Sequence, residues 1–110
     1  MPAAPGDVPR DMTALLSWYA KHREKVHPLV LALYFHVGFE TVHPFVDGNG
    51  RVGRLLLNHI LHRNGYPMVN IPNSQRGRYY AVLHEAQVRG DLRPFIEFVM
   101  ELYRESHLSF

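Results

Sequence analysis

Apolar residues recur at helical spacing along most of this 110-residue chain. Positions three and four apart lie on one face of a helix, so this pattern predicts helices that each bury one side. No segment of the chain gives a convincing β-hairpin signal. We therefore expect an all-α fold, a compact bundle of about five helices. The expected helices cover roughly residues 10–24, 28–42, 50–63, 74–89 and 92–107.

The segment 28–42 differs from the other four because its apolar residues surround the helix axis almost completely. A helix that is apolar on every side normally lies at the centre of a core. Each of the other segments has one apolar face. For the segment 50–63 the residues expected on the inner face are Val52, Leu55, Leu56, His59 and Ile60.

Residues that start or stop helices mark the ends of these segments. Residues 1–9 contain three prolines and a glycine, so we expect an irregular leader there and one core domain over residues 10–107. Residues 68–71 could form a short extended stretch between the third and fourth helices. The other end signals are Asn64-Gly65 and Gly90 at C-terminal ends, and Asn73 or Ser74 and Asp91 as N-caps.

The composition excludes several classes of function. The chain has no cysteine, which excludes a thiol nucleophile and a cysteine-ligated zinc. It has no apolar stretch of membrane-spanning length and no secretory signal, so we expect a cytoplasmic protein without a membrane partner. The net charge is only +2, and arginines cluster locally at 51–54 and 76–78. This distribution favours a small anionic ligand over nucleic acid.

The segment before the third helix has the features of a phosphate site. Gly48 and Gly50 let a ligand approach the backbone closely, and the helix that begins near Gly50 directs its unpaired N–H groups and its positive dipole end to the same place. Arg51 and Arg54 share a face of the first turn and could both bind phosphate oxygens through their forked N–H groups.

Two further residues of this loop fit other duties. A lone carboxylate beside a polyphosphate is a typical way to hold Mg²⁺, and Asp47 has that place. His43 lies at the end of the central helix, and its ordinary pKa suits removal of a proton from a hydroxyl group. Each feature alone is weak, because glycine turns, exposed arginines and helix-end histidines are common. Their combination within twelve residues is much more specific to a nucleotide-handling enzyme.

Other clusters give weaker hypotheses. His36, Glu40 and His43 could gather a metal on one helical face, but a buried and satisfied His36 is the better interpretation. For Trp18 and Tyr103 packing in the core is favoured over stacking on a base.

The segment from His43 to Arg54 resembles the signature of Fic domains. That signature is His-Pro-Phe-x-Asp-Gly-Asn-Gly-Arg-x-x-Arg, and the segment matches it at every specified position. The resemblance covers about residues 7–103 and is greatest to the animal and archaeal branch. It implies a Fic fold with the catalytic loop between the second and third helices. It also implies transfer of AMP from ATP to a protein hydroxyl, with release of pyrophosphate. The similar segments outside the signature are Leu55-Leu56-Leu57-Asn58, Gly65-Tyr66-Pro67, Gln75-Arg76 with Tyr79-Tyr80, and Gly90-Asp91-Leu92-Arg93-Pro94-Phe95.

The resemblance also implies a role for each site residue. His43 would be the general base for a Ser, Thr or Tyr hydroxyl of a target protein, and Asp47 would hold Mg²⁺ against the phosphates. Phe45 would pack the loop into the core, and Gly48, Asn49 and Gly50 would form a cradle for the phosphates. Arg51 would stabilise the phosphate chain, and Arg54 would bind the γ-phosphate. Tyr80 would line the adenine pocket, and Gln87 would contact the nucleoside.

Two elements of the family are expected to be missing from this chain. Relatives align the target peptide on a β-hairpin upstream of the region that matches residues 8–9, and many carry an inhibitory helix whose glutamate pairs with the second motif arginine. Two alternatives therefore stay open: a Fic fold that uses another nucleotide donor, or a nucleotide-binding core that lacks catalysis without its flap. Family members often dimerise, so a homodimer also stays open.

Overall fold

The computed structural model describes residues 7–107, and within them it consists of helices joined by loops, without strands. The expected all-α architecture is confirmed. The elements are α1 (Val8–His22), α2 (Pro28–Val42), α3 (Asn49–Arg63), a short 3₁₀ helix η2 (Asn73–Gln75), α4 (Arg76–Arg89) and α5 (Arg93–His107).

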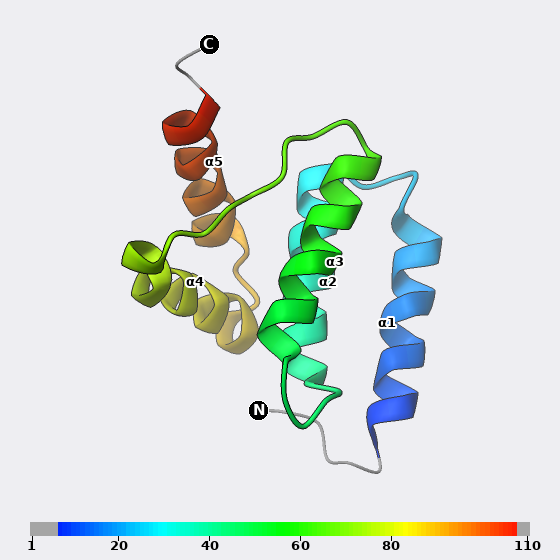
Figure 1. The fold of residues 1–110 in the computed structure, drawn as a ribbon. Helices are drawn as coiled ribbons and strands as arrows, with labels where there is room; N and C mark the ends of the chain where they lie inside the picture. Colours follow the sequence, from blue (N-terminus) through cyan, green and yellow to red (C-terminus); the bar gives the residue numbers. More distant parts are fainter. Residues whose placement is uncertain (1–6, 108–110) are drawn as a thin grey trace.

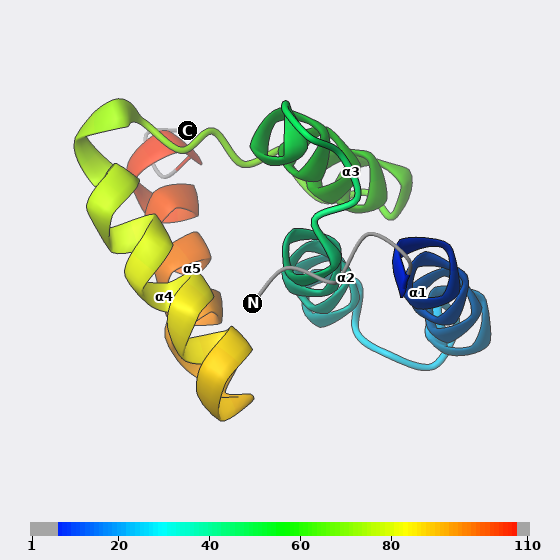
Figure 2. The same cartoon turned by 90° about the horizontal axis from the view of Figure 1, so that it is seen from below.

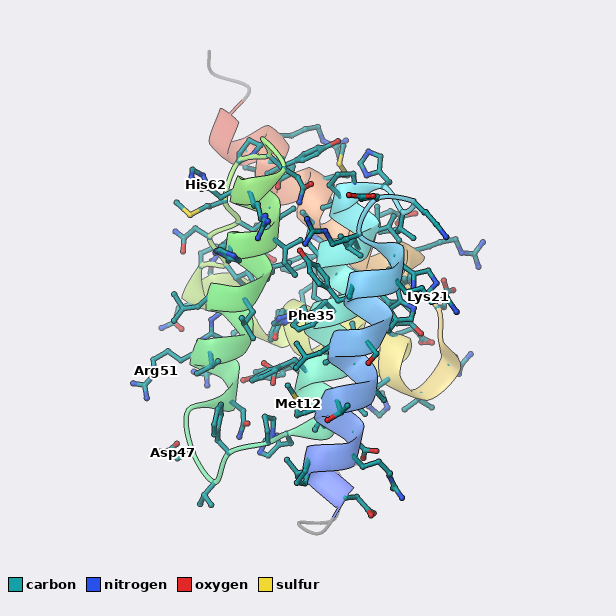
Figure 3. The ribbon with its side chains drawn as sticks, turned by 90° about the vertical axis from the view of Figure 1, so that its right-hand side faces the viewer. Met12, Lys21, Phe35, Asp47, Arg51 and His62 are labelled. Carbon is teal, nitrogen blue, oxygen red and sulfur yellow. The ribbon has the colours of Figure 1, made fainter. Side chains whose placement is uncertain are left out.

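Helix α2 is the centre of the fold, as its pattern predicts. It packs against all four other α-helices. Helices α1 and α3 lie alongside it, while α4 and α5 form a pair on another side (Figures 1 and 2). The residues of α2 that are buried are Leu29, Leu31, Ala32, Leu33, Phe35, His36, Phe39 and Val42. Figure 3 shows Phe35 in the interior between the helices.

Helix α1 begins at Val8, so residues 8 and 9, expected to end the irregular leader, already form its first turn. The reason is Pro9, whose fixed φ suits the first turn of a helix rather than the residue before it. The helix also ends at His22, two residues earlier than predicted. The rest of the predicted leader, residues 1–6, lies outside the described residues.

The expected inner face of α3 is correct only in part: Ile60 is buried and Val52 and Leu56 pack against the core, but the other two residues do not. Leu55 is 68% exposed and His59 is exposed, whereas Gly53, Leu57 and Leu61 are buried. The leucine run does not determine the orientation of this helix. Its contact with α2 is made where Gly53 leaves room for side chains of α2, and the helix is rotated accordingly.

The connection from α3 to α4 has no regular structure before η2 and is held by one side chain of α3. The side-chain amide of Asn58 donates to the carbonyl of Val69 (3.0 Å) and accepts from the N–H of Val69 (2.7 Å). It thus pairs with both backbone groups of Val69, as a neighbouring strand would. The predicted caps Asn73 and Ser74 make no capping hydrogen bond, because η2 precedes α4. Asp91 does cap α5, since its carboxylate accepts from the N–H of Arg93 at 3.1 Å.

Within residues 7–107, no helix combines the length and the apolar character that crossing a membrane requires.

Candidate functional site: a phosphate pocket beside the α2–α3 loop

The loop that carries the candidate site begins at His43, directly after α2. His43 has a left-handed backbone (φ 54°), and its N–H still donates to the carbonyl of Phe39 at 2.9 Å. It is the only non-glycine residue with positive φ among residues 7–107. This conformation ends the helix at once and turns the chain into the loop. The side chain of His43 is exposed, so a group from outside the molecule can reach it.

The loop is closed by Asn49, whose side chain is buried. Its amide accepts from the N–H of Phe45 (2.9 Å) and donates to the carbonyl of Phe45 (2.7 Å). Because these bonds occupy both ends of the amide, the Asn49 side chain holds the loop, and only its backbone N–H could face a phosphate. Phe45 itself is 50% exposed, with its ring 6.3 Å from that of Phe39. The implied packing of Phe45 into the core is therefore only partial.

The N-terminal end of α3 has the properties of an anion site. Gly48 precedes the helix with φ 81°, and no side chain caps the first N–H groups. A Cβ placed on Gly48 would lie 3.2 Å from the guanidinium of Arg51, and one on Gly50 would lie 3.3 Å from that of Arg54. Both arginines therefore lie over the first turn, where the absence of side chains leaves the backbone open. Figure 3 shows Asp47 and Arg51 at this same end of the molecule.

A pocket of about 370 Å³ lies between this helix end, the segment before η2 and the start of α4. It joins several of the predicted site residues and adds others from the α3–α4 connection. Arg76 extends over the ring of Tyr80, with its guanidinium carbon 5.8 Å from the ring centre. The lining residues are Asp47, Gly48, Gly50, Arg54, Ile71, Pro72, Asn73, Arg76, Tyr79 and Tyr80. His43, Asn49, Arg51 and Gln87 are not among them.

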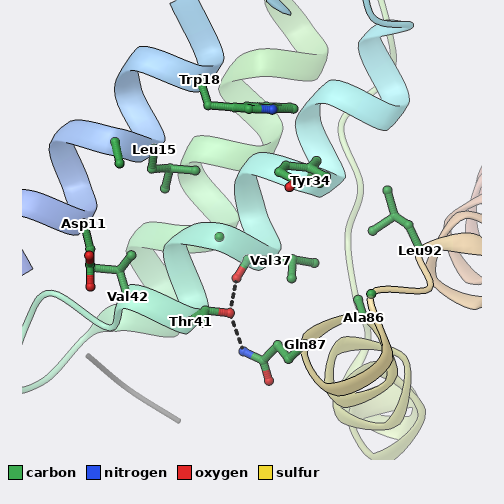
Figure 4. Close-up of a pocket in the computed structure, with 13 residues that line it drawn as sticks. Asp11, Leu15, Trp18, Tyr34, Val37, Thr41, Val42, Ala86, Gln87 and Leu92 are labelled. Carbon is green, nitrogen blue, oxygen red and sulfur yellow. Dashed lines mark hydrogen bonds between the residues drawn. The ribbon is translucent and has the colours of Figure 1, made fainter. Parts of the chain in front are cut away.

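Gln87 lies in a different cleft, so the pocket that contains Tyr80 and Arg54 gives its implied nucleoside contact no support. Its amide donates to the hydroxyl of Thr41 at 3.1 Å (Figure 4). The cleft, of about 580 Å³, is bordered mainly by apolar residues of α1 and α2, including Trp18 and Tyr34. The rings of these two residues stack at 4.2 Å. Gln87 is two turns of helix α4 after Tyr80, which places it near the other end of that helix.

Beneath the pocket lies a group of buried polar residues that sequence reasoning did not assign to the site. His36 is fully buried, and its ring bonds to the carbonyl of Gly53 (2.9 Å) and to the hydroxyl of Tyr79 (2.7 Å). These bonds use both ring nitrogens, so His36 is a satisfied core histidine and has no lone pair for a metal. Among the described residues no other group of three metal-ligating side chains gathers either.

Burial shifts the protonation of this polar group. It lowers the pKa of His36 to about 4, with a further lowering by the charge of Arg54. It also raises the pKa of Glu40 above its usual range, although His43 and Arg54 act in the opposite direction. The Oε1 atom of Glu40 is buried and has no hydrogen-bond partner within residues 7–107. A signal for this group was present in the sequence, since His36 and Glu40 are polar residues within the most apolar helix.

A side chain at Gly53 would be crowded, because a Cβ there would lie 2.6 Å from Oε1 of Glu40 and 3.3 Å from His36. We expect Gly53→Ala to lower the free energy of unfolding by about 1–3 kcal/mol, the usual cost of overpacking. Gly77→Ala is the matched control, since nothing lies within 4 Å of the added Cβ. It should keep or raise stability, by up to about 1 kcal/mol. Urea unfolding checks both, and equal stability of the two variants would contradict this packing.

The neutral, buried His36 predicts a dependence of stability on pH. The unfolded chain takes up a proton on His36 near pH 6.5, whereas the folded chain does so only near pH 4. Stability is therefore complete above pH 6.5 and falls as pH drops toward 4, by on the order of 3 kcal/mol. Urea unfolding across this range should show a weaker pH dependence for His36→Leu than for the unchanged chain. Equal slopes would show that His36 is not the group responsible.

Comparison with known proteins identifies relatives over most of the chain. The model of the Fic/DOC family matches residues 1–61, more than half of the sequence. The protein adenylyltransferase Fic of Drosophila melanogaster is 43% identical over 102 residues, which are 92% of this chain and 20% of that protein. The same figures hold for the protein of that name from Drosophila persimilis. The chain thus spans about a fifth of the length of these curated relatives.

Solved structures agree with the sequence match. A Fic domain-containing signalling protein from Bacteroides thetaiotaomicron superposes with a TM-score of 0.87 at 35% identity, covering 94% of this chain and 44% of that one. Fic-1 from C. elegans gives a TM-score of 0.82 at 39% identity, covering 96% of this chain and 32% of that one. The likeness extends over nearly the whole helical bundle.

Proposed function

Because this chain belongs to the Fic/DOC family, we propose that it is the catalytic core of a protein adenylyltransferase, which transfers AMP from ATP to a hydroxyl group of a target protein. The observation that carries the proposal is one pocket that combines the open helix end of α3 with Arg54, Asp47 and Tyr80, directly beside the loop that His43 begins. Anion-binding, metal-binding and ring-stacking groups in one cavity suit a nucleoside triphosphate.

The proposed binding mode follows from the sides of the pocket. The phosphates lie over Gly48 and Gly50, where backbone N–H groups and the helix dipole attract negative charge. Arg54 borders the pocket and binds the γ-phosphate, while Arg51 acts from the exposed face of the same turn. The ring of Tyr80, which is 49% exposed, offers a surface for the adenine base.

In the proposed reaction His43 takes the proton of a Ser, Thr or Tyr hydroxyl of the target. The hydroxyl oxygen forms a bond to the α-phosphorus, and the bond from that phosphorus to the oxygen bridging to the β-phosphorus breaks. Pyrophosphate leaves with the electron pair of the broken bond. Two features support His43 for this role: its ring is exposed, and the rigid end of α2 determines its position.

Asp47 fits the requirements of a Mg²⁺ ion held together with a nucleotide. Its carboxylate lies at the pocket, and one oxygen accepts from the N–H of Gly48 at 2.8 Å, which fixes its direction. A single carboxylate is sufficient for Mg²⁺, which keeps waters and phosphate oxygens as its other ligands. The bound ion would neutralise charge on the phosphates. The proposed partners are thus ATP with Mg²⁺ and a target protein in the cytoplasm, rather than nucleic acid or a membrane.

The test is mass spectrometry of the chain after incubation with Mg²⁺ and each nucleoside triphosphate in turn. Calorimetry measures nucleotide binding in parallel. An adenylyl group on a hydroxyl side chain, formed from ATP, is the expected result. A different nucleotidyl adduct would show another donor. Heat of ATP binding without any adduct would show a core that binds nucleotide but does not transfer it, and either result would overturn the proposal.

A further inference from the structure

Tyr79 precedes Tyr80 in the sequence but has the opposite environment. Tyr80 is half exposed, whereas Tyr79 is 3% exposed and its hydroxyl lies inside the polar group beneath the pocket. The two rings meet edge to face at 5.1 Å. Tyr79 nevertheless borders the pocket, together with Arg54. It therefore connects the interior of the bundle with the phosphate site.

The directions of the hydrogen bonds around Tyr79 follow from their partners. The carbonyl of Gly53 can only accept, so Nδ1 of His36 carries the proton and donates to it. Nε2 of the neutral ring is then an acceptor, and the Tyr79 hydroxyl donates to it. The pKa of His36 is lowered to about 4, so the ring stays neutral near pH 7. The proton of the Tyr79 hydroxyl is used in this bond, so its oxygen can only accept a hydrogen bond from any further group.

Arg54 is the cation beside the lone pairs of this oxygen, since it borders the same pocket as Tyr79. Its charge acts on the Tyr79 hydroxyl, so its guanidinium lies near enough to be a donor to that oxygen. Burial, and then the charge of Glu40, raise the pKa of Tyr79, so the hydroxyl remains protonated and keeps donating to His36. The series of hydrogen bonds runs from the backbone of α3 through His36 to Tyr79, which borders the pocket together with Arg54, a side chain of α3 itself.

We propose that Tyr79 is a positioning residue for Arg54: its hydroxyl, fixed by His36, holds the guanidinium at the pocket before the nucleotide binds. An arginine side chain has many rotamers, and ordering it costs free energy when a ligand binds. The Tyr79 hydroxyl, whose direction is fixed by its hydrogen bond to His36, reduces that cost by ordering the guanidinium beforehand. This inference rests on the proposed function, in which Arg54 binds the γ-phosphate of ATP.

Tyr79→Phe tests the inference, because it removes the hydroxyl and keeps the ring. We expect calorimetry to show ATP binding weakened about tenfold and AMP binding changed by less than about twofold, since only ATP has the γ-phosphate. The matched control is Tyr103→Phe. It also removes a tyrosine hydroxyl, one that donates to the carbonyl of Pro67 away from the pocket, and it should leave both affinities unchanged.

A purely structural role of Tyr79 gives a different result. Tyr79→Phe leaves Nε2 of His36 without its partner, so it should also lower stability. The double variant His36→Leu with Tyr79→Phe removes both polar partners and should recover part of that stability while ATP stays weakly bound. If the double variant restores ATP affinity, or if Tyr79→Phe lowers the melting temperature while the ratio of ATP to AMP affinity stays unchanged, the inference is overturned.

Measuring Arg54→Ala in parallel separates the two claims. If Arg54→Ala weakens ATP selectively and Tyr79→Phe does not, the positioning role falls while the γ-phosphate assignment stands. If neither variant distinguishes ATP from AMP, Arg54 does not bind the γ-phosphate, and the positioning role falls with it.

Discussion

Replacing His43 with alanine is expected to reduce AMP transfer by about a hundredfold to ten-thousandfold, the usual contribution of a general base. The affinity for ATP should change by less than about twofold, because a base acts in the chemical step and His43 lies outside the phosphate pocket. The two effects are read separately, by label transferred from α-labelled ATP and by calorimetry.

The matched control for this variant is His62→Ala. His62 is exposed in the last turn of α3, at the opposite end of that helix from Asp47 (Figure 3). It should leave both transfer and binding unchanged. Transfer that survives in His43→Ala would show that another group takes the proton. A large loss of ATP affinity would show that His43 contributes to binding instead.

Replacing Arg54 with alanine is expected to weaken ATP binding by about ten- to a hundredfold while AMP binding changes little. The removed interaction is a hydrogen bond between charged groups, worth about 1.5–3 kcal/mol. AMP has no γ-phosphate, so it does not make this bond and loses nothing. Arg63→Ala is the control, since Arg63 is an exposed arginine in the last turn of the same helix. Equal losses of affinity for ATP and AMP would show that Arg54 does not bind the γ-phosphate.

The features predicted correctly from the sequence are those with a local cause. The central position of α2 follows from apolar residues around its whole axis, and its ends follow from Pro28 and from the loop after Val42. The open first turn of α3 follows from Gly48 and Gly50, which depend only on neighbouring residues. Gly90 ends α4 in a left-handed conformation, as a glycine at that place predicts.

The features missed depend on contacts between distant parts of the chain. The orientation of α3 is determined by the space that Gly53 leaves for Glu40, which periodicity within α3 alone does not contain. Gln87 lies outside the lining of the phosphate pocket, and its amide donates to Thr41 of α2, 46 positions away. The bond between His36 and Tyr79 joins residues 43 positions apart, so neither residue shows its partner in its own segment.

Asn49 illustrates a detail that the signature leaves open, the direction of a side chain within the loop. The signature places it between two glycines of the phosphate cradle, and nothing in the sequence indicates where its side chain points. Its amide instead closes the loop on Phe45, an interaction of four-residue separation that depends on the conformation of the loop. A side chain in a binding motif can therefore serve the shape of the site rather than the ligand.

The most direct test of the account compares two labels of ATP in the unchanged chain and in His43→Ala. The account predicts that label from the α-phosphate appears on protein, that label from the γ-phosphate leaves in pyrophosphate, and that neither appears on protein with His43→Ala. Protein labelled from the γ-phosphate, or α-label that persists in His43→Ala, would contradict AMP transfer with His43 as the base.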